Sequence, residues 1–443
     1  MHLTAPPVVL DYTLEDLYSL DGGQASNIVL AYAFPASRAE VEGFCPLSQM
    51  FTCQNPLLDI STRELIVEHL KSVPQQCGFI ADNIETIPLS STLHRDDALG
   101  VYQQLCPSQR LSMTFKRPLD IKLRPNFRIA IIDPVDCLEH LPHHNPAFQP
   151  QSQQVIRCQI RLDQLNNPQD VASEIQRMLS HVYTAPLPFV IKVPQANTSE
   201  GTFIVKTETD RHSSSSILQD ELQRMIHEMS PSNYHLNDCG LILQDSIPGP
   251  SIALSLFVTR SGRCIFISCA RQVFDAAGLW AGGRISYAEQ DTLGADLEPL
   301  SARVARYLHG HGYRRPFGID VIFGSDSKSN GSTSTEQPLV IDLNVRVMGT
   351  HALGCLRGHF VERGLYEAAM IPMLEVHCTR AVFQGYFSEK MGRGCIVLMS
   401  WSTRSGKRPS TAALAIASAD GYELEKLLDI LDAFDKDRSG SCF

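Results

Sequence analysis

The feature that most constrains this chain is a pair of short apolar segments with acidic residues inside them. Residues 317–323 (F-G-I-D-V-I-F) and 338–344 (P-L-V-I-D-L-N) have the pattern of strands, and a polar, low-complexity loop joins them. Side chains alternate between the two faces of a strand, so Asp342 and Asn344 lie on one face. We therefore expect the two strands to bring Asp320 and Asp342 to one place.

A carboxylate within an apolar strand needs a partner, and two like charges placed together are costly. The usual relief is a cation, and oxygen-only ligands favour Mg²⁺ bound between protein carboxylates and phosphates. The pattern predicts that Asp320, Asp342 and Asn344 bind a divalent metal ion. The alternative is that each aspartate makes turn hydrogen bonds or an ion pair with Arg346.

Composition limits the partners and the compartment. The chain has 443 residues, 43% of them hydrophobic, and a formal net charge of -10, so it is a globular protein of several units without a basic field for nucleic acid. Its 13 cysteines form no C-x-x-C pair, which favours free thiols in a reducing compartment. Without a signal peptide or about 18 consecutive apolar residues, we expect a cytoplasmic protein that contacts no membrane.

The order of elements is clearest after a polar stretch at 141–154, which predicts a boundary near residue 150. Before it, residues 127–134 have the pattern of a buried strand. After it the pattern predicts strand, loop, strand, helix and strand, at 186–193, 195–201, 202–206, 217–229 (after the serine tract 213–216) and 239–243. Two more strands, joined by a hairpin turn at 259–263, and a helix follow at 252–258, 264–270 and 302–310.

Lys192 is a charged residue within the apolar strand F-V-I-K-V. The glycine-ended loop that follows can bind phosphates through its backbone N–H groups. Lysine and loop together predict an anion site, whereas a lysine alone at a strand end is more often a solvated edge residue.

These parts occur in the order found in the ATP-grasp superfamily, which the sequence resembles over roughly residues 180–360. The resemblance looks closest to the amino-acid-ligating, carboxylate–amine ligase branch. The matching motifs are F-V-I-K-V at 189–193, T-S-E-G-T-F at 198–203, L-I-L-Q-D-S-I-P-G at 241–249, G-I-D at 318–320 and I-D-L-N-V-R-V-M-G at 341–349.

The resemblance implies an α/β (α+β) protein with the ATP-grasp fold. Its parts would be an N-terminal α/β domain at 1–150, a mobile lid subdomain at 151–250 and a catalytic domain with a C-terminal extension at 251–443. It also implies ATP as cosubstrate with Mg²⁺, or Mn²⁺ in its place. The implied contacts are Lys192 near the adenine and α-phosphate; Thr198, Ser199, Gly201 and Thr202 over the phosphates; Gln244, Asp245, Ile247 and Ser251 at the adenine and ribose; Asp320, Asp342 and Asn344 on the metal; and Arg346 and Arg284 as catalytic residues.

Residues outside these motifs carry weaker expectations. Arg284 and Arg271 lie where the resemblance implies a basic residue near the γ-phosphate, and a salt-bridged surface arginine is the alternative. His351, Cys355 and Arg357 follow the last motif and are candidates for the acceptor pocket, with core packing as the alternative for the cysteine.

The activity that the resemblance implies is amide formation. ATP would phosphorylate a carboxylate, an amine would displace the phosphate, and one of these small-molecule substrates would be an amino acid. A homodimer and a place in specialised metabolite biosynthesis are compatible with it. Two alternatives stay open: phosphorylation of an enol or hydroxyl by the same apparatus, and a non-catalytic ATP-binding module, since Gln244, Ser251 and Asp342 depart from the family's usual acids.

Overall fold

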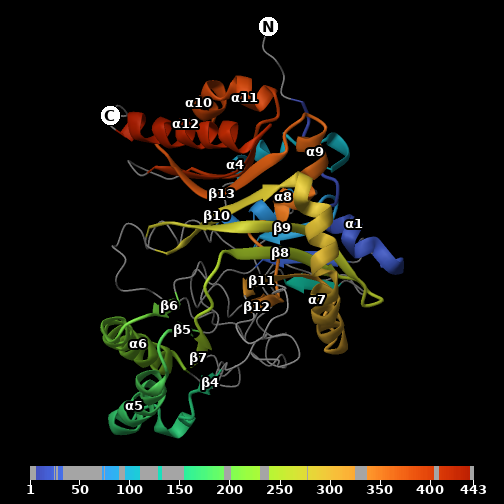
Figure 1. The fold of residues 1–443 in the computed structure, drawn as a ribbon. Coiled ribbons are helices and arrows are strands. Elements are labelled where there is room, and N and C mark those ends of the chain that lie inside the picture. The colour runs from blue at the N-terminus through green and yellow to red at the C-terminus, as the bar shows by residue number, and fades with distance from the viewer. Residues whose placement is uncertain are drawn as a thin grey trace, which may run out of the picture.

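The computed structural model describes residues 6–23, 25, 28–32, 72–73, 75–88, 95–109, 128–131, 154–193, 201–229, 239–276, 278–324, 337–403 and 409–439. These residues form three sheets with helices packed around them, which confirms the expected α/β (α+β) class (Figure 1). The sheets fall within the ranges 1–150, 151–250 and 251–443, one in each. No helix of the described residues is long and apolar enough to cross a membrane.

The first sheet is parallel, with strand order β2-β1-β3. Its last strand lies within the predicted strand 127–134. Helix α1 begins at a capping box in which Thr13 and Asp16 satisfy each other's backbone N–H groups. The elements of this range are α1 (Leu14–Ser19), β1 (Ile28–Tyr32), β2 (Glu85–Pro88), α4 (Arg95–Tyr102) and β3 (Arg128–Ile131).

The second sheet is antiparallel, with order β4-β7-β5-β6, and we call it with its two helices the lid subdomain. The predicted hairpin that carries Lys192 is confirmed as β5 and β6. Helices α5 and α6 cover one face of the sheet and share its apolar core. The bounds are β4 (Gln154–Arg157), α5 (Pro168–Thr184), β5 (Phe189–Lys192), β6 (Thr202–Val205), α6 (Glu208–Glu228) and β7 (Gly240–Asp245).

Helix α6 corrects the sequence prediction, because it begins at Glu208 and not after the serine tract. Thr207 and Asp210 form a capping box that starts the helix one turn before the serines. Ser214 and Ser215 lie within the helix and are buried. Ser213 and Ser216 are exposed, so the serine tract spans both faces of a capped helix despite the modest helix propensity of serine.

The third sheet is wholly antiparallel and has eight strands in the order β12-β11-β8-β9-β10-β13-β15-β14. Helix α7 packs on one face of β8, β9 and β11 and begins at Gln290, earlier than predicted. The bounds are β8 (Ser251–Val258), β9 (Cys264–Phe274), β10 (Trp280–Ser286), α7 (Gln290–Gly310), β11 (Pro316–Gly324), β12 (Gln337–Asn344), α8 (His351–Cys355), α9 (Arg357–Val361), β13 (Glu367–Val376), α10 (Arg380–Tyr386), α11 (Ser388–Gly392), β14 (Ile396–Ser402), β15 (Ser410–Ser418) and α12 (Gly421–Ser439).

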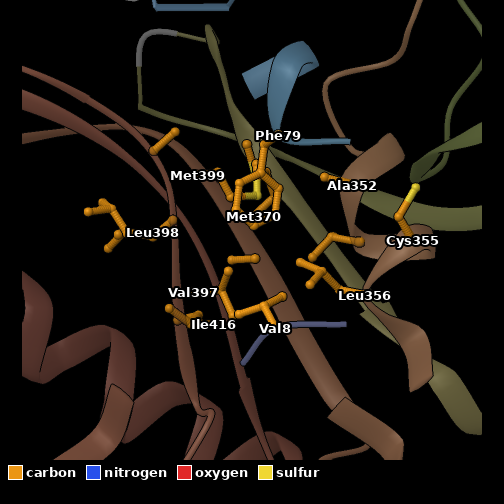
Figure 2. Close-up of a cluster of buried hydrophobic side chains, with 14 of the residues drawn as sticks. Val8, Phe79, Ala352, Cys355, Leu356, Met370, Val397, Leu398, Met399 and Ile416 are labelled. Carbon is orange, nitrogen blue, oxygen red and sulfur yellow. The ribbon is translucent and has the colours of Figure 1, made fainter. Parts of the chain in front are cut away.

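The largest apolar core joins the two ends of the chain. Val8 and Phe79 from the N-terminal range lie among Met370, Leu398 and Ile416 of the large sheet (Figure 2). Helix α4 packs on β14, and α12 packs on β13 and β15. The N-terminal range therefore completes the core of the C-terminal range, while the lid subdomain has a core of its own.

Candidate active site

The edge of the large sheet contains a β-bulge at the acidic motif. Asp320 of β11 pairs directly with Asp342 of β12, and the next pair is Val321 with Val340. Ile341 is thus the extra residue, without a partner in the ladder of β11 and β12. The predicted meeting of the two aspartates is confirmed, because cross-strand partners point to the same face.

Asp320 is in an unfavourable environment for a charge. Its Oδ1 atom is inaccessible to solvent and makes no hydrogen bond with any described residue, while Oδ2 lies 3.5 Å from the Asn344 amide nitrogen. Burial, and next the Asp342 carboxylate, raise the pKa of Asp320 to about 7, against the lowering effects of Gln272 and the cations Lys192 and Arg346. A carboxyl of this kind takes up a proton readily or needs a further cation.

Lys192 reaches this pair from the lid subdomain. Its ammonium group donates to the Ile341 carbonyl at 2.6 Å and lies 3.8 Å from Asp342 Oδ1. The Gln244 side-chain amide donates to the same carbonyl at 3.2 Å. Ile341 has no partner in the ladder of this edge strand, and its carbonyl is the point where two strands of the lid subdomain contact the large sheet.

The face of the lid sheet that carries Lys192 is the one that α5 and α6 do not cover. Alternation along the strands puts Val190, Ile204, Ile242 and Gln244 on this face with Lys192, opposite the face that α5 and α6 cover. Ile204 is 57% exposed, although apolar residues of its size are usually buried. The arrangement provides an apolar surface bordered by an amide and an ammonium group.

The donor set fits a hard divalent cation completed by other oxygens. Asp320, Asp342 and Asn344 supply carboxylate and amide oxygens, and the Oδ1 atom of Asp320, which has no hydrogen-bond partner within the described ranges, is available as a metal ligand. Within the described ranges no group of three or more His, Cys, Asp or Glu side chains could hold a metal ion. Two carboxylates suit Mg²⁺, which usually keeps waters and binds substrate phosphates beside one or two carboxylates.

The two predicted catalytic arginines lie on different sides of the large sheet. Arg346 follows β12, is half-buried, donates to the Val347 carbonyl at 3.3 Å and acts electrostatically on Asp320. Arg284 is the cross-strand partner of Arg271, and Arg271 is the partner of Ile252. Asp320 is the partner of the next residue along that strand, Ala253, so Arg284 and Asp320 lie in adjacent rows of the sheet. Arg284 therefore points to the opposite face, where its guanidinium bonds Glu425 of α12. The structure does not bring Arg284 to the site.

The remaining predicted contacts are distributed around the lid subdomain. Thr198 and Ser199 lie outside the described residues. Gly201 is buried and its carbonyl accepts from the Val193 N–H at 2.8 Å, and Thr202 is the cross-strand partner of Lys192. Asp245, the last residue of β7, is exposed, and Ile247 beyond it is half-buried. Ser251 begins β8, and its hydroxyl is inaccessible with no hydrogen-bond partner among the described residues.

The residues after the last motif contribute to packing more than to an open pocket. Arg357 makes a two-pronged ion pair with Asp291, at 2.8 and 3.1 Å. Cys355 lies in the main core, and burial raises the pKa of its thiol. His351 is fully buried, and burial lowers its pKa to about 4, so its ring is neutral at pH 7.

Two parts of the site were missing from the sequence prediction. Gln272 stabilises the charged form of Asp320 from β9, and it lies beyond Ala270, where the predicted strand ended. The sequence feature that could have indicated Gln272 is the alternation Ser268, Ala270, Gln272, which extends the strand by two residues and keeps Gln272 on the same face. No residue type in the sequence indicates the contact at the Ile341 carbonyl, because it is a backbone atom whose role depends on tertiary placement.

Comparison with known proteins gives a limited likeness. No family model and no curated protein matches the sequence. Among solved structures, the chain is similar to the ADP complex of purK, an N5-carboxyaminoimidazole ribonucleotide synthetase, with 9% identity, 92% of this chain and 97% of that chain covered, and a TM-score of 0.43.

Two further structures are comparable. The N5-carboxyaminoimidazole ribonucleotide synthetase of Thermus thermophilus has 14% identity, covers 92% of this chain and 98% of its own, and has a TM-score of 0.41. The N5-carboxyaminoimidazole synthetase of Staphylococcus aureus with ADP has 9% identity, covers 91% and 96%, and has a TM-score of 0.42. These are ATP-grasp proteins, the superfamily that the sequence motifs resemble. At TM-scores of 0.43 and below, the likeness adds no argument about activity, which rests on the geometry of the site.

Proposed function

We propose that this protein is an ATP-dependent carboxylate–amine ligase, which joins a small carboxylic acid and an amine through an acyl phosphate and releases ADP and phosphate. The observation that carries the proposal is the position of Lys192, 2.6 Å from the carbonyl of Ile341 and 3.8 Å from Asp342 Oδ1. It lies beside Asp320, whose Oδ1 atom has no hydrogen-bond partner among the described residues. One positive group of the lid subdomain and two carboxylates of the large sheet thus meet at one point.

This combination suits a nucleotide bound as its Mg²⁺ complex. The apolar side chains on this face, of which Ile204 is exposed, Val190 half-buried and Ile242 buried, can cover an adenine ring, and Gln244 offers an amide at their border. Lys192 provides positive charge for phosphate oxygens next to the metal ligands. A nucleotide with its adenine on the lid sheet would extend its phosphates toward Asp320 and Asp342.

The chain's own residues account for most of what phosphoryl transfer needs, which is positioning and charge neutralisation. Mg²⁺, when bound, would neutralise charge that develops on the transferred phosphoryl group. Asp320, Asp342 and Asn344 would hold the cation, Gln272 would keep Asp320 oriented, and Arg346 would stabilise the transferred group or the substrate carboxylate. The lid subdomain would exclude water, since an acyl phosphate hydrolyses in solvent.

We assign the acid and the amine only by class. An amino acid carries both a carboxylate and an amine, the two groups that the proposed reaction joins. We therefore infer an amino acid as one of the two substrates, in a biosynthetic reaction that forms an amide. The product then has the mass of the acid plus the amine minus water, which distinguishes it from a phosphorylated product.

The test is ADP and phosphate release from purified protein with Mg²⁺ and ATP, across pools of amino acids and small carboxylic acids, followed by mass spectrometry of active pools. The proposal predicts pool-dependent ADP release with an amide product, lost in Asp342→Asn and kept in Asp296→Asn, an exposed aspartate of α7. A phosphorylated product that forms without any amine would assign the site to a kinase. ATP binding without turnover in every pool would assign it to a non-catalytic module.

A further inference from the structure

Two cysteines face each other across the lid sheet. Cys158 follows β4 and Cys239 precedes β7, and the ladder of these strands continues through them because the Cys158 N–H donates to the Cys239 carbonyl at 2.9 Å. Both side chains belong to the core under α5 and α6, on the same face as Ile156 and Leu241. Both cysteines carry thiols in the structure.

The backbone arrangement of Cys158 and Cys239 is compatible with a disulfide bond between them. Opposed residues of a hydrogen-bonded antiparallel pair have Cα atoms about 5.5 Å apart, within the about 4.4–6.8 Å that disulfides span. Cross-strand partners also direct their side chains to one face. The two thiols are already in contact, since the Cys158 sulfur is hydrogen-bonded to that of Cys239.

The two thiols differ in reactivity. Hydrogen bonding to Cys239 lowers the pKa of Cys158 against the effects of burial and of Glu174 on α5. Elsewhere, burial raises the pKa of both Cys264 and Cys269 to about 12. Cys158 retains 8% exposure, whereas Cys239 is fully buried. Cys158 is therefore the thiol that ionises more readily and that a small oxidant reaches first, and Cys239 is placed to react with it.

We propose that Cys158 and Cys239 form a peroxide-sensitive dithiol that closes to a disulfide within the lid subdomain. The Cys158 thiolate attacks one oxygen of hydrogen peroxide, forms a sulfenic acid and releases hydroxide. The Cys239 sulfur attacks the Cys158 sulfur, the S–O bond breaks as the S–S bond forms, and the hydroxyl group leaves with the Cys239 proton as water. Two thiols are oxidised, and one peroxide becomes two waters once the first hydroxide takes up the proton that Cys158 lost.

The bond would fasten the edge of the lid sheet. Strand β4 pairs only with β7 in the described sheet. The other end of β7 carries Gln244, which contacts the large sheet. A covalent link at one end of this ladder reduces opening of β4 away from β7. Oxidation would therefore rigidify the strand that contacts the large sheet at the Ile341 carbonyl.

The experiment treats the whole protein with hydrogen peroxide, unfolds it in urea with an alkylating reagent, and maps the peptides without reduction. The proposal predicts loss of two alkylatable thiols, a cross-linked peptide that joins Cys158 to Cys239, and recovery with dithiothreitol. Backbone amides of β4 should exchange about tenfold more slowly after oxidation. A Cys264→Ala variant, which removes a half-buried cysteine of β9, should form the same cross-link.

Two variants separate the steps. In Cys239→Ala, peroxide should leave Cys158 as a sulfenic acid that a dimedone probe traps, and in Cys158→Ala, Cys239 should remain a thiol. The proposal fails if Cys158 and Cys239 stay fully alkylatable in oxidised wild-type protein, or if either is cross-linked mainly to another cysteine. The wild-type map alone decides this, even where a variant does not fold.

Discussion

The two ends of the eight-stranded sheet have the same antiparallel backbone and opposite characters. At one end, every residue of β15, Ser410–Ser418, is buried, and alanine fills four of its nine positions. At the other end, the β11–β12 pair carries Asp320, Asp342 and Asn344, all partly accessible, and a bulge interrupts the ladder.

The difference follows from what covers each end. Helices α4 and α12 and the N-terminal segment pack against the β13–β15–β14 end, far from the lid subdomain in Figure 1. The β11–β12 edge is instead met by the lid subdomain through Lys192 and Gln244. One end therefore supplies stability, and the other keeps unsatisfied groups available for a ligand.

The largest expected effect is at the polar end. Asp342→Asn removes one of the two paired carboxylates, and the rate of ADP formation should fall by about 10²–10³-fold, the usual cost of losing one preorganised electrostatic contact. The free energy of unfolding should not decrease, because the substitution also removes like-charge repulsion with Asp320. ADP release and urea denaturation measure the two quantities. Wild-type turnover in the variant would disprove the metal assignment.

The opposite pattern is expected at the apolar end. Leu414 of β15 is fully buried, so Leu414→Ala should lower the free energy of unfolding by about 3 kcal/mol. ADP formation per folded molecule should stay unchanged, because Leu414 lies at the other end of the sheet from the site. Ile430→Ala on α12, which is 41% exposed, is the control with a small effect. Equal losses of turnover from Leu414→Ala and Asp342→Asn would remove the distinction between the two ends.

A buried carboxyl in the N-terminal range gives stability at that end a pH dependence. Burial, and then the neighbouring Glu15 and Asp16 carboxylates, raise the pKa of Asp82 to about 6. A raised folded-state pKa contributes stability that is complete below the unfolded value of about 4 and is lost as pH rises through 6. Asp82→Asn should thus gain stability relative to wild type, by on the order of 1 kcal/mol, between pH 4 and pH 7.

Urea midpoints of the two proteins across this range provide the measurement. Asparagine tolerates the positive φ of 61° at this position, so the substitution is not expected to strain the backbone. A stability difference that is constant with pH would show that Asp82 does not titrate as described.

The smallest effect is expected from Arg284→Gln. Its guanidinium bonds Glu425 on the face opposite to Asp320, and both partners are partly exposed. Such a pair contributes at most about 1 kcal/mol to stability, and turnover should stay within about twofold of wild type. A large drop in turnover at full stability would mean that Arg284 swings to the site and that the sheet separates the two faces less strictly.

The sequence predicted the local parts of the site well. Alternation in residues 317–323 and 338–344 was enough to place Asp320 and Asp342 together, and apolar runs on both sides of a polar loop predicted the hairpin that carries Lys192. The capping box of Thr207 and Asp210 is also visible in the sequence, although the predicted helix begins only after the serine tract. Periodicity and caps depend on neighbours in the chain, so they can be recognised without a structure.

Long-range placement could not be predicted in this way. The bulge at Ile341 depends on the register between two strands, and residue types do not record it. The register also places the side chains of Arg284 and Asp320 on opposite faces of the sheet, since a shift of one residue would move Arg284 to the other face. Likewise, Val8 and Phe79 enter a core built mainly by residues after 350, a contact that follows from tertiary packing and not from local pattern.

The most direct measurement is calorimetric binding of ATP, with and without Mg²⁺, to wild type, Lys192→Met and Asp342→Asn. The controls are Lys206→Met, an exposed lysine at the end of the lid hairpin, and Asp296→Asn. If one site joins the lid lysine to the carboxylates of the large sheet, Mg²⁺ strengthens binding and both site variants weaken it at least about tenfold, while the controls do not. Equal binding by wild type and both site variants would contradict the account.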